Sequence, residues 1–169
     1  MKTNNMIATR CKGERGMSLI EMMVVVALVA ICTLWGTQSW RGYQQAIRLE
    51  QHAQRLRLYL YGVQSEANNY NLSAVLWAIG GKDGCVGYGP RPSDCHNATG
   101  KIFVTEEHDI ELSGLADKSM GFYGLRNAAM AGRLTLKNSA GSLRLVLSAR
   151  GRLRICSEDK PLLGISLCQ

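Results

Sequence analysis

The sequence has 169 residues, which leaves room for one modest domain together with a membrane anchor. It is 46% hydrophobic and 20% charged, so a packed core is feasible and an intrinsically disordered chain is excluded. The net charge is +7, but four basic residues against Glu14 in the first sixteen positions supply +3 of it. The overall basicity is therefore a weak argument for nucleic-acid binding, and the local distribution of basic residues is a better one.

Residues 1–16 form a basic leader that ends in glycine, and the positive-inside rule predicts that this leader stays in the cytoplasm. The stretch from Met17 to Trp40 contains 24 residues, of which Glu21 is the only charged one. Its length is close to the roughly 20 residues that a membrane-spanning helix requires. A single carboxylate in hydrocarbon is costly, so Glu21 is by default a functional residue.

Two other interpretations of this region fit less well. An ordinary secretory signal needs small residues at a cleavage site after the apolar run, and Trp35 and Gln38 interrupt that part of the sequence. A plain transmembrane anchor would leave the combination of Gly16 and Glu21 unexplained. The leader is long, and Met6 is an alternative start.

The motif from Arg15 to Glu21, followed by its apolar run, resembles the type III signal of type IV prepilins and type II secretion pseudopilins. This resemblance implies that prepilin peptidase cuts after Gly16 and that Met17, where the family usually has phenylalanine, becomes the methylated N-terminus. It implies that Glu21 guides assembly by pairing with the free amine of Met17 on a neighbouring subunit, because a buried carboxylate needs a partner. The implied partners are other minor and major pilins and the inner-membrane assembly platform.

Beyond Trp40 the apolar residues recur at steps of three and four, which is typical of an amphipathic helix. The stripe consists of Ala46, Leu49, Ala53, Leu56, Leu60, Val63 and Ala67. We expect one continuous helix from about Met17 to about Asn68, with residues 17–40 in the membrane or filament core and residues 41–70 as a stem. Residues 68–71, which are rich in asparagine, supply the stop. A free-standing coiled coil is disfavoured, because the strand-rich remainder needs a helix to cover its apolar face.

Residues 71–169 are expected to form a periplasmic, β-rich domain. Alternating apolar residues and turn signals predict strands at 73–79, 101–105, 132–137, 142–147 and 152–156, with a glycine-rich loop at 80–100. The last three segments form an antiparallel meander that buries its leucines. The predicted fold class is α+β, with a long N-terminal helix packed on a small antiparallel sheet, and the resemblance implies a type IV pilin-like fold.

Four of the six cysteines form two closely spaced pairs in this domain, whereas Cys11 lies in the leader and Cys32 in the apolar run. We expect disulfides Cys85–Cys95 and Cys156–Cys168, which suit an oxidising periplasm. The first would close a loop of about eleven residues and contribute on the order of 2–3 kcal/mol. The second would pin the C-terminus to the last strand.

Metal sites are the alternatives for two clusters. Zinc is disfavoured because no C-x-x-C spacing is present, although His96 adjoins Cys95. Calcium is disfavoured because the acidic cluster lacks a regular calcium-loop spacing, so a solvated strand edge is preferred. That cluster comprises Glu106, Glu107, Asp109 and Glu111.

The second half carries a further resemblance. The segments 124–129 and 151–156, with Gly132, Asn138 and Gly141 between them, are similar to the C-terminal signature of GspH/FimT-type minor pseudopilins. More narrowly, residues 122–127 and 151–154 resemble the prepilin-peptidase-dependent protein A family of enterobacteria. This resemblance implies a minor pilin that primes or caps a filament.

Basic residues dominate the end of the domain. From Ser119 to Ser157 there is no acidic residue, and seven are basic: Arg126, Arg133, Lys137, Arg144, Arg150, Arg152 and Arg154. The last three cluster at one turn, where they would bind phosphates with strong salt dependence. FimT-type relatives that are similar here are linked to DNA uptake, so a DNA-binding tip pilin is the alternative function. Such charges can equally form a solvated face or meet the acidic patch of a neighbouring pilin.

An enzyme is not expected. The sequence has no nucleophile elbow, phosphate-binding loop or metal-ligand spacing, and we expect no cofactor and no metal site. The histidines His52, His96 and His108 are interpreted as surface residues. The principal hypothesis is a structural one: a minor pilin or pseudopilin that primes or caps a type IV pilus or a type II secretion pseudopilus.

Overall fold

The computed structural model describes residues 17–97, 100–105, 109–113, 115, 119–124 and 128–168. The predicted cleavage residue Gly16 lies outside these residues. So do Glu106 and Glu107 of the acidic cluster, His108, and Arg126 of the basic residues. The chain divides into two compact units, Met1–Ser39 and Trp40–Gln169, which are described separately.

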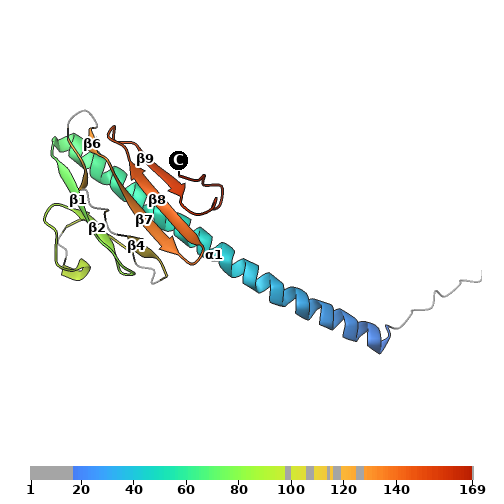
Figure 1. Ribbon diagram of the computed structural model, residues 1–169. Coiled ribbons are helices and arrows are strands. Elements are labelled where there is room, and N and C mark those ends of the chain that lie inside the picture. The colour runs from blue at the N-terminus through green and yellow to red at the C-terminus, as the bar shows by residue number, and fades with distance from the viewer. Residues whose placement is uncertain are drawn as a thin grey trace, which may run out of the picture. The chain divides into compact units, whose positions relative to one another are not determined.

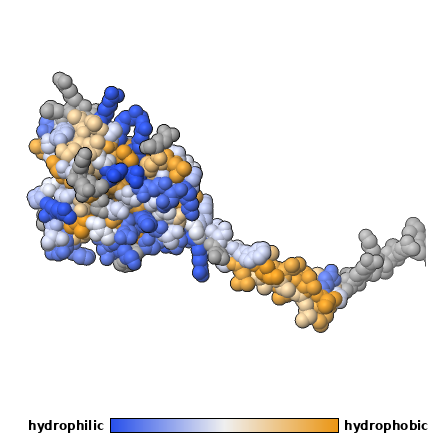
Figure 2. Space-filling model, viewed as in Figure 1, coloured by the Kyte–Doolittle hydropathy of each residue, from blue (hydrophilic) through white to orange (hydrophobic). Residues whose placement is uncertain are grey.

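In the first unit, helix α1 (Leu19–Tyr70) begins two residues after the predicted start. The carbonyl oxygen of Ser18 accepts hydrogen bonds from the N–H groups of Glu21 at 3.0 Å and Met22 at 3.2 Å, and serine is a favoured N-cap residue. The described side chains up to Ser39 are exposed, and apolar ones cover most of this part of the helix (Figure 2). By length and composition, α1 is the one helix among the described residues that could cross a membrane, with a mean hydropathy of 2.3 over an 18-residue window.

In the second unit, α1 buries the predicted apolar stripe. All seven residues of this stripe are at most 7% exposed, and Leu49, Leu56 and Leu60 are fully buried. The helix stops in the asparagine-rich segment as predicted. Asn71 adopts a left-handed conformation with φ 52°, and the N–H of Leu72 donates to the carbonyl oxygen of Ala67 at 3.0 Å. This pattern is a Schellman motif, which satisfies a carbonyl at the helix end.

Within the described residues, nine strands form two antiparallel sheets (Figure 1). The first sheet has the order β3-β2-β1-β5-β6, with β1 Ala74–Ile79, β2 Cys85–Tyr88, β3 Phe103–Val104, β5 Met120–Phe122 and β6 Ala129–Met130. The second sheet has the order β4-β7-β8-β9, with β4 Glu111–Ser113, β7 Gly132–Asn138, β8 Gly141–Leu147 and β9 Leu153–Ser157. A short 3-10 helix, η1, spans Cys95–Asn97.

Backbone hydrogen bonds join the two sheets. Only Ala131 separates β6 from β7, so the chain passes there from the first sheet into the second. Gly81, in the turn after β1, exchanges two 2.9 Å hydrogen bonds with Leu112 in β4. The N–H of Ala129 in β6 donates to the carbonyl oxygen of Ala149, in the turn after β8, at 3.0 Å. Residues of both sheets therefore share one hydrophobic core with the α1 stripe.

The predicted α+β class is confirmed, and so is the meander of the last three strands. Its alternation buries leucines of β7, β8 and β9, as expected for sheets with one covered face. These are Leu134, Leu136, Leu143, Leu145, Leu147 and Leu153. The expectation of a single sheet is wrong, because β1, β2, β3, β5 and β6 build a sheet of their own, whereas β4 joins the meander.

The predicted loop at 80–100 contains a strand. β2 pairs with β1 in antiparallel register, with Gly87 opposite Trp77. A Cβ atom at Gly87 would lie 2.3 Å from Cζ2 of the Trp77 ring, so glycine is needed for the ring to lie across the strand. A four-residue strand that contains glycine gives too short an alternation to detect in the sequence.

His52 is not a surface residue as predicted. Its side chain is 3% exposed and packs edge-on against Phe103 of β3, with ring centroids 6.2 Å apart. The first sheet therefore covers a wider face of α1 than the stripe alone. His96 is exposed, in agreement with the prediction, and His108 lies outside the described residues.

Gly124, one of the residues behind the family resemblance, has a packing role. A Cβ atom there would lie 2.5 Å from the backbone of Asn71 and of Leu72. The segment after β5 therefore passes directly against the end of α1, and only glycine permits this approach.

Candidate functional site

The first candidate site is the start of α1. Met17 and Glu21 are both exposed, and Glu21 lies in the first helical turn, where the helix dipole favours a negative charge. The exposed side chains that follow are apolar up to Cys32, which is free. A carboxylate at the head of an uncovered apolar helix is the arrangement that the sequence predicted, although Gly16 itself lies outside the described residues.

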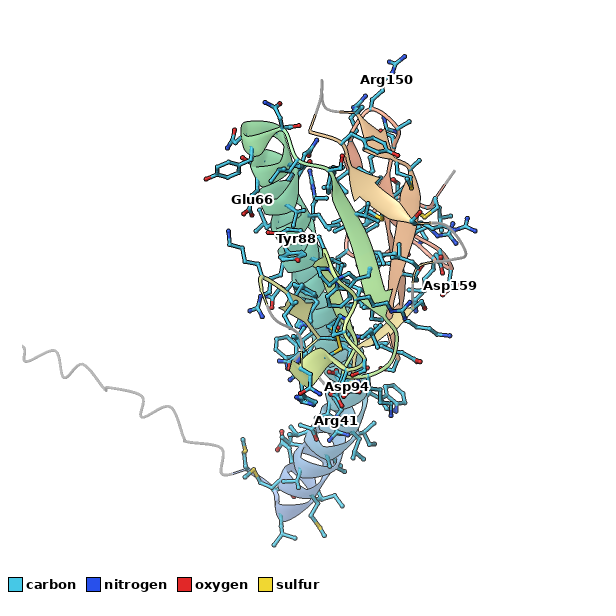
Figure 3. All side chains as sticks on the ribbon, turned by 90° about the vertical axis from the view of Figure 1, so that its left-hand side faces the viewer. Arg41, Glu66, Tyr88, Asp94, Arg150 and Asp159 are labelled. Atoms are coloured by element: carbon cyan, nitrogen blue, oxygen red, sulfur yellow. A yellow bond between two sulfur atoms is a disulfide. The ribbon has the colours of Figure 1, made fainter. Side chains whose placement is uncertain are left out.

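The second candidate site is the turn between β8 and β9. The N–H of Gly151, whose φ is 71°, donates to the carbonyl oxygen of Ser148 at 2.9 Å, and the Ser148 Oγ accepts from the N–H of Arg152 at 3.1 Å. Arg150, Arg152 and Arg154 are all exposed, and Arg150 extends away from the strands (Figure 3). The structure thus brings together the three arginines that the sequence singled out.

These arginines line a groove of about 650 Å³, which we call the arginine groove. One wall is the segment 150–154, and the other is the last part of α1. Its lining is Arg57, Tyr61, Gln64, Ser65, Asn68, Asn69, Arg150, Gly151, Arg152, Leu153 and Arg154. Every charged residue among these described lining residues is an arginine, so the groove favours an anionic occupant.

Sequence reasoning missed Arg57, which supplies the fourth arginine from α1. Its Nη2 donates to the Tyr61 hydroxyl at 3.3 Å, and its guanidinium carbon lies 5.4 Å from the centre of the Tyr61 ring. The four-residue spacing of Arg57 and Tyr61 could have shown that they share a helix face. Their position beside Arg152 could not have been inferred, because it depends on how α1 packs against β9.

The other basic residues of this group that the structure describes do not line the groove. Arg133 and Lys137 are exposed on β7. Arg144 was expected on the solvated face, but it is half-buried and forms an ion pair with Glu158. Glu158 also accepts a hydrogen bond from the Thr135 hydroxyl at 3.3 Å. Because Glu158 neutralises the charge of Arg144, this arginine adds nothing to the basic surface.

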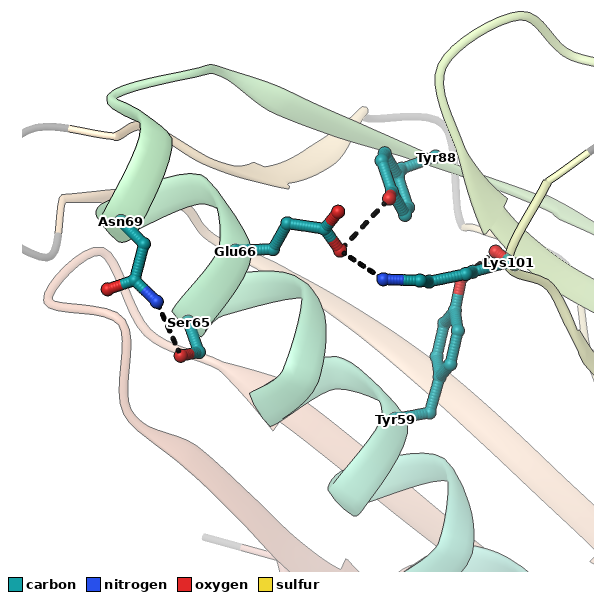
Figure 4. Close-up of polar contacts among 6 residues, drawn as sticks. All are labelled: Tyr59, Ser65, Glu66, Asn69, Tyr88 and Lys101. Carbon is teal, nitrogen blue, oxygen red and sulfur yellow. Dashed lines mark hydrogen bonds and ion pairs between the residues drawn. The ribbon is translucent and has the colours of Figure 1, made fainter.

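A polar cluster fastens the segment before β3 to α1 (Figure 4). The Glu66 carboxylate accepts hydrogen bonds from the Tyr88 hydroxyl and from Lys101 Nζ, both at 3.2 Å. The Tyr59 hydroxyl donates to the carbonyl oxygen of Lys101 at 2.7 Å. Burial, together with the nearby Tyr88 and Glu66, raises the pKa of Tyr59 to about 12. The hydrogen bond to Glu66 likewise raises the pKa of the Lys101 ammonium.

Both expected disulfides are present. Cys85 and Cys95 have Cα atoms 5.8 Å apart, and Cys156 and Cys168 have Cα atoms 4.9 Å apart. The second bond fixes the tail, in which Leu167 pairs in parallel with Ser157 of β9. In the acidic cluster, Asp109 pairs with Arg48 at 3.8 Å. Among the described residues, no three His, Cys, Asp or Glu side chains gather as metal ligands.

With this geometry in place, comparison with known proteins gives one finding. Residues 11–36 match the family model described as the prokaryotic N-terminal methylation motif. This motif supports a type IV pilin-like protein. The long helix followed by antiparallel sheets is consistent with a type IV pilin-like fold. No curated protein and no solved structure matches the chain.

The motif implies processing by prepilin peptidase and pilin-type partners, and the apolar helix suggests a membrane anchor. The matched residues include Gly16, Glu21 and most of the apolar run. The match covers the start of α1, so it says nothing of the arginine groove.

Proposed function

We propose that the chain is a minor pilin or pseudopilin of the GspH/FimT type, which primes or caps a type IV pilus or type II secretion pseudopilus. One observation carries the proposal: the methylation motif leads directly into an apolar helix whose side chains are uncovered. Uncovered apolar surface of that length needs either lipid or neighbouring subunits. The role is structural and involves no reaction of its own.

In this proposal, prepilin peptidase removes residues 1–16 and Met17 becomes the methylated N-terminus. The chain first sits in the inner membrane with residues 71–169 in the periplasm, where both disulfides form. Extraction by the assembly platform then moves the helix from lipid into a filament core. There Glu21 pairs with the amine of Met17 on an adjacent minor or major pilin, which offsets two buried charges.

Mass spectrometry of the protein from cells with and without prepilin peptidase tests the proposal. We expect a chain that begins at methylated Met17 in the first case and an intact leader in the second. A Glu21→Val variant should be processed normally, yet it should be lost from sheared filaments. Processing that does not depend on the peptidase would overturn the proposal.

DNA capture is a second candidate function, favoured by the four arginines of the groove and by the absence of carboxylates among the described residues that line it. The arginines would then displace the counterions that surround the DNA phosphates, and affinity would fall steeply with salt. We expect Arg152→Ala with Arg154→Ala to abolish a salt-sensitive shift of labelled DNA. Arg133→Ala with Lys137→Ala removes the same charge from β7 and should retain it. Without a shift for the unmodified chain at low salt, this candidate fails.

A further inference from the structure

The ladder between β8 and β9 determines which backbone groups of β9 face outward. The N–H of Ser148 donates to the carbonyl oxygen of Arg152, and the N–H of Glu158 donates to that of Ser142, both at 3.0 Å. Ser148 with Arg152 and Ser142 with Glu158 continue the β8–β9 register by one residue at either end. Since bonded and non-bonded pairs alternate in an antiparallel ladder, the even-numbered residues of β9 bond to β8.

The odd-numbered residues Leu153, Ile155 and Ser157 therefore turn their N–H and C=O groups away from β8. Those of Ser157 are taken by the tail, through 2.9 Å hydrogen bonds with Ser166 and Cys168. Within the part of the chain that the structure describes, no such bond is seen for the outward groups of Leu153 and Ile155. This open stretch has the hydrogen-bonding pattern of a sheet edge that can accept another strand.

The open stretch lies beside a helix. Just before its N-terminal end, the outward carbonyl oxygen of Gly151 accepts a 3.0 Å hydrogen bond from the side-chain amide of Gln64 on α1. Leu153 itself lines the arginine groove, opposite α1 residues such as Tyr61. A groove between an edge strand and a helix is the setting in which several domains bind extended peptides by strand addition.

The positive charges beside β9 determine which kind of strand can add to it. Arg152 and Arg154 alternate with Leu153 and Ile155, so their side chains flank the position of any added strand. Arg57 supplies a further positive charge from α1. A second copy's β9 would bring identical arginines opposite these, and like charges directly opposite each other are destabilising. Carboxylates at alternate positions of the added strand would pair with them.

We propose that the arginine groove binds an extended acidic segment of a partner protein, which adds to β9 as a further strand. The segment presents aspartate or glutamate beside Arg152 and Arg154 and bonds through its backbone to Leu153 and Ile155. This inference rests on the proposed pilin function, and it makes the partner a neighbouring subunit of the filament.

The test uses the full chain in detergent micelles and a fluorescent peptide in which glutamate and valine alternate. Two further peptides carry N-methyl groups on the backbone nitrogens of either the glutamates or the valines. They keep all charges but block one edge or the other of the extended peptide. We expect fluorescence anisotropy to show binding of the parent peptide and a loss of about tenfold or more for one of the two methylated peptides. Equal binding of both methylated peptides would overturn the inference.

Variants of the chain provide the second measurement. Arg152→Ala with Arg154→Ala should weaken the parent peptide strongly, whereas Arg133→Ala with Lys137→Ala on β7 should leave it unchanged. A single-stranded oligonucleotide of matched charge serves as competitor. Efficient displacement by the oligonucleotide, combined with indifference to N-methylation, would show a phosphate site instead and overturn the inference.

Processing is measured on the same preparation by intact mass. A chain that is cut after Gly16 and binds none of the peptides would overturn this inference and leave the proposed function standing. A chain that is never processed would overturn the proposed function whatever the peptides do.

Discussion

The side-chain amide of Gln64 donates a 3.0 Å hydrogen bond to the carbonyl oxygen of Gly151, a residue 87 positions further along the chain. The bond is partly buried and joins α1 to the turn between β8 and β9. It therefore spans the two walls of the arginine groove and holds them at a fixed separation.

Replacing Gln64 by alanine should destabilise the folded domain by about 1 kcal/mol, because a partly buried carbonyl loses its donor. Urea unfolding followed by circular dichroism measures the change. Gln51→Ala is the matched control, since Gln51 is exposed on the same helix and should change stability little. Equal effects of the two substitutions would show that the bond to Gly151 contributes nothing.

Gly87→Ala should destabilise the domain by about 1–3 kcal/mol, because the added methyl group meets the Trp77 ring across β1 and β2. Tryptophan fluorescence during urea unfolding reports the loss and the displacement of the ring. Gly62→Ala provides a contrast of opposite sign. Gly62 lies in α1 with nothing within 4 Å of its Cβ position, so alanine should stabilise the helix by about 0.5–1 kcal/mol.

The helical and meander parts of the fold could be predicted because their periodicities are long. The α1 stripe repeats over more than five turns, and the leucines of β7 and β8 alternate across a short turn. By contrast, β2 and β3 have four and two residues, and their existence depends on pairing with β1 and packing on α1. His52 was misassigned for the same reason, since its cover is Phe103 of β3.

The candidate sites divide in the same way. The motif from Gly16 to Glu21 is local in sequence, so the sequence alone could define it. Only part of the arginine groove is local in sequence. Arg152 and Arg154 lie at one turn, whereas Arg57 lies far away in the sequence, on α1. Alternation also predicted Arg144 on the open face, whereas Glu158 in the segment after β9 folds back to pair with it.

Tyr59 should make stability depend on pH in the alkaline range. Its folded-state pKa of about 12 lies above the ordinary value of 10.0, so the folded protein holds this proton more tightly than the unfolded chain. The resulting stabilisation is fully present below pH 10 and is lost as pH rises towards 12. An ultraviolet titration should show a late-ionising tyrosine that Tyr59→Phe removes. Tyr43→Phe is the control, because Tyr43 is exposed and is not a member of the Glu66 cluster.

Removing the second disulfide by Cys156→Ser with Cys168→Ser should cost about 2–3 kcal/mol, because the unfolded chain regains the freedom of a loop of about thirteen residues. The tail should also become accessible to limited proteolysis, since its pairing with Ser157 is no longer covalently supported. Cys32→Ser is the control, because Cys32 is a free cysteine in the other unit. An unchanged cleavage pattern would mean that Leu162, which is buried, suffices to hold the tail.

Neither disulfide joins α1 to a strand: both close short loops within the β-rich part of the chain. A force applied along α1 would therefore act on the sheets by two routes. One is shear across the seven buried side chains of the α1 stripe, and the other is the short covalent link between Tyr70 and β1. Shear loads many contacts at once, whereas peeling breaks them one by one. We therefore expect the domain to resist a pull along α1 better than a pull that peels one edge of a sheet.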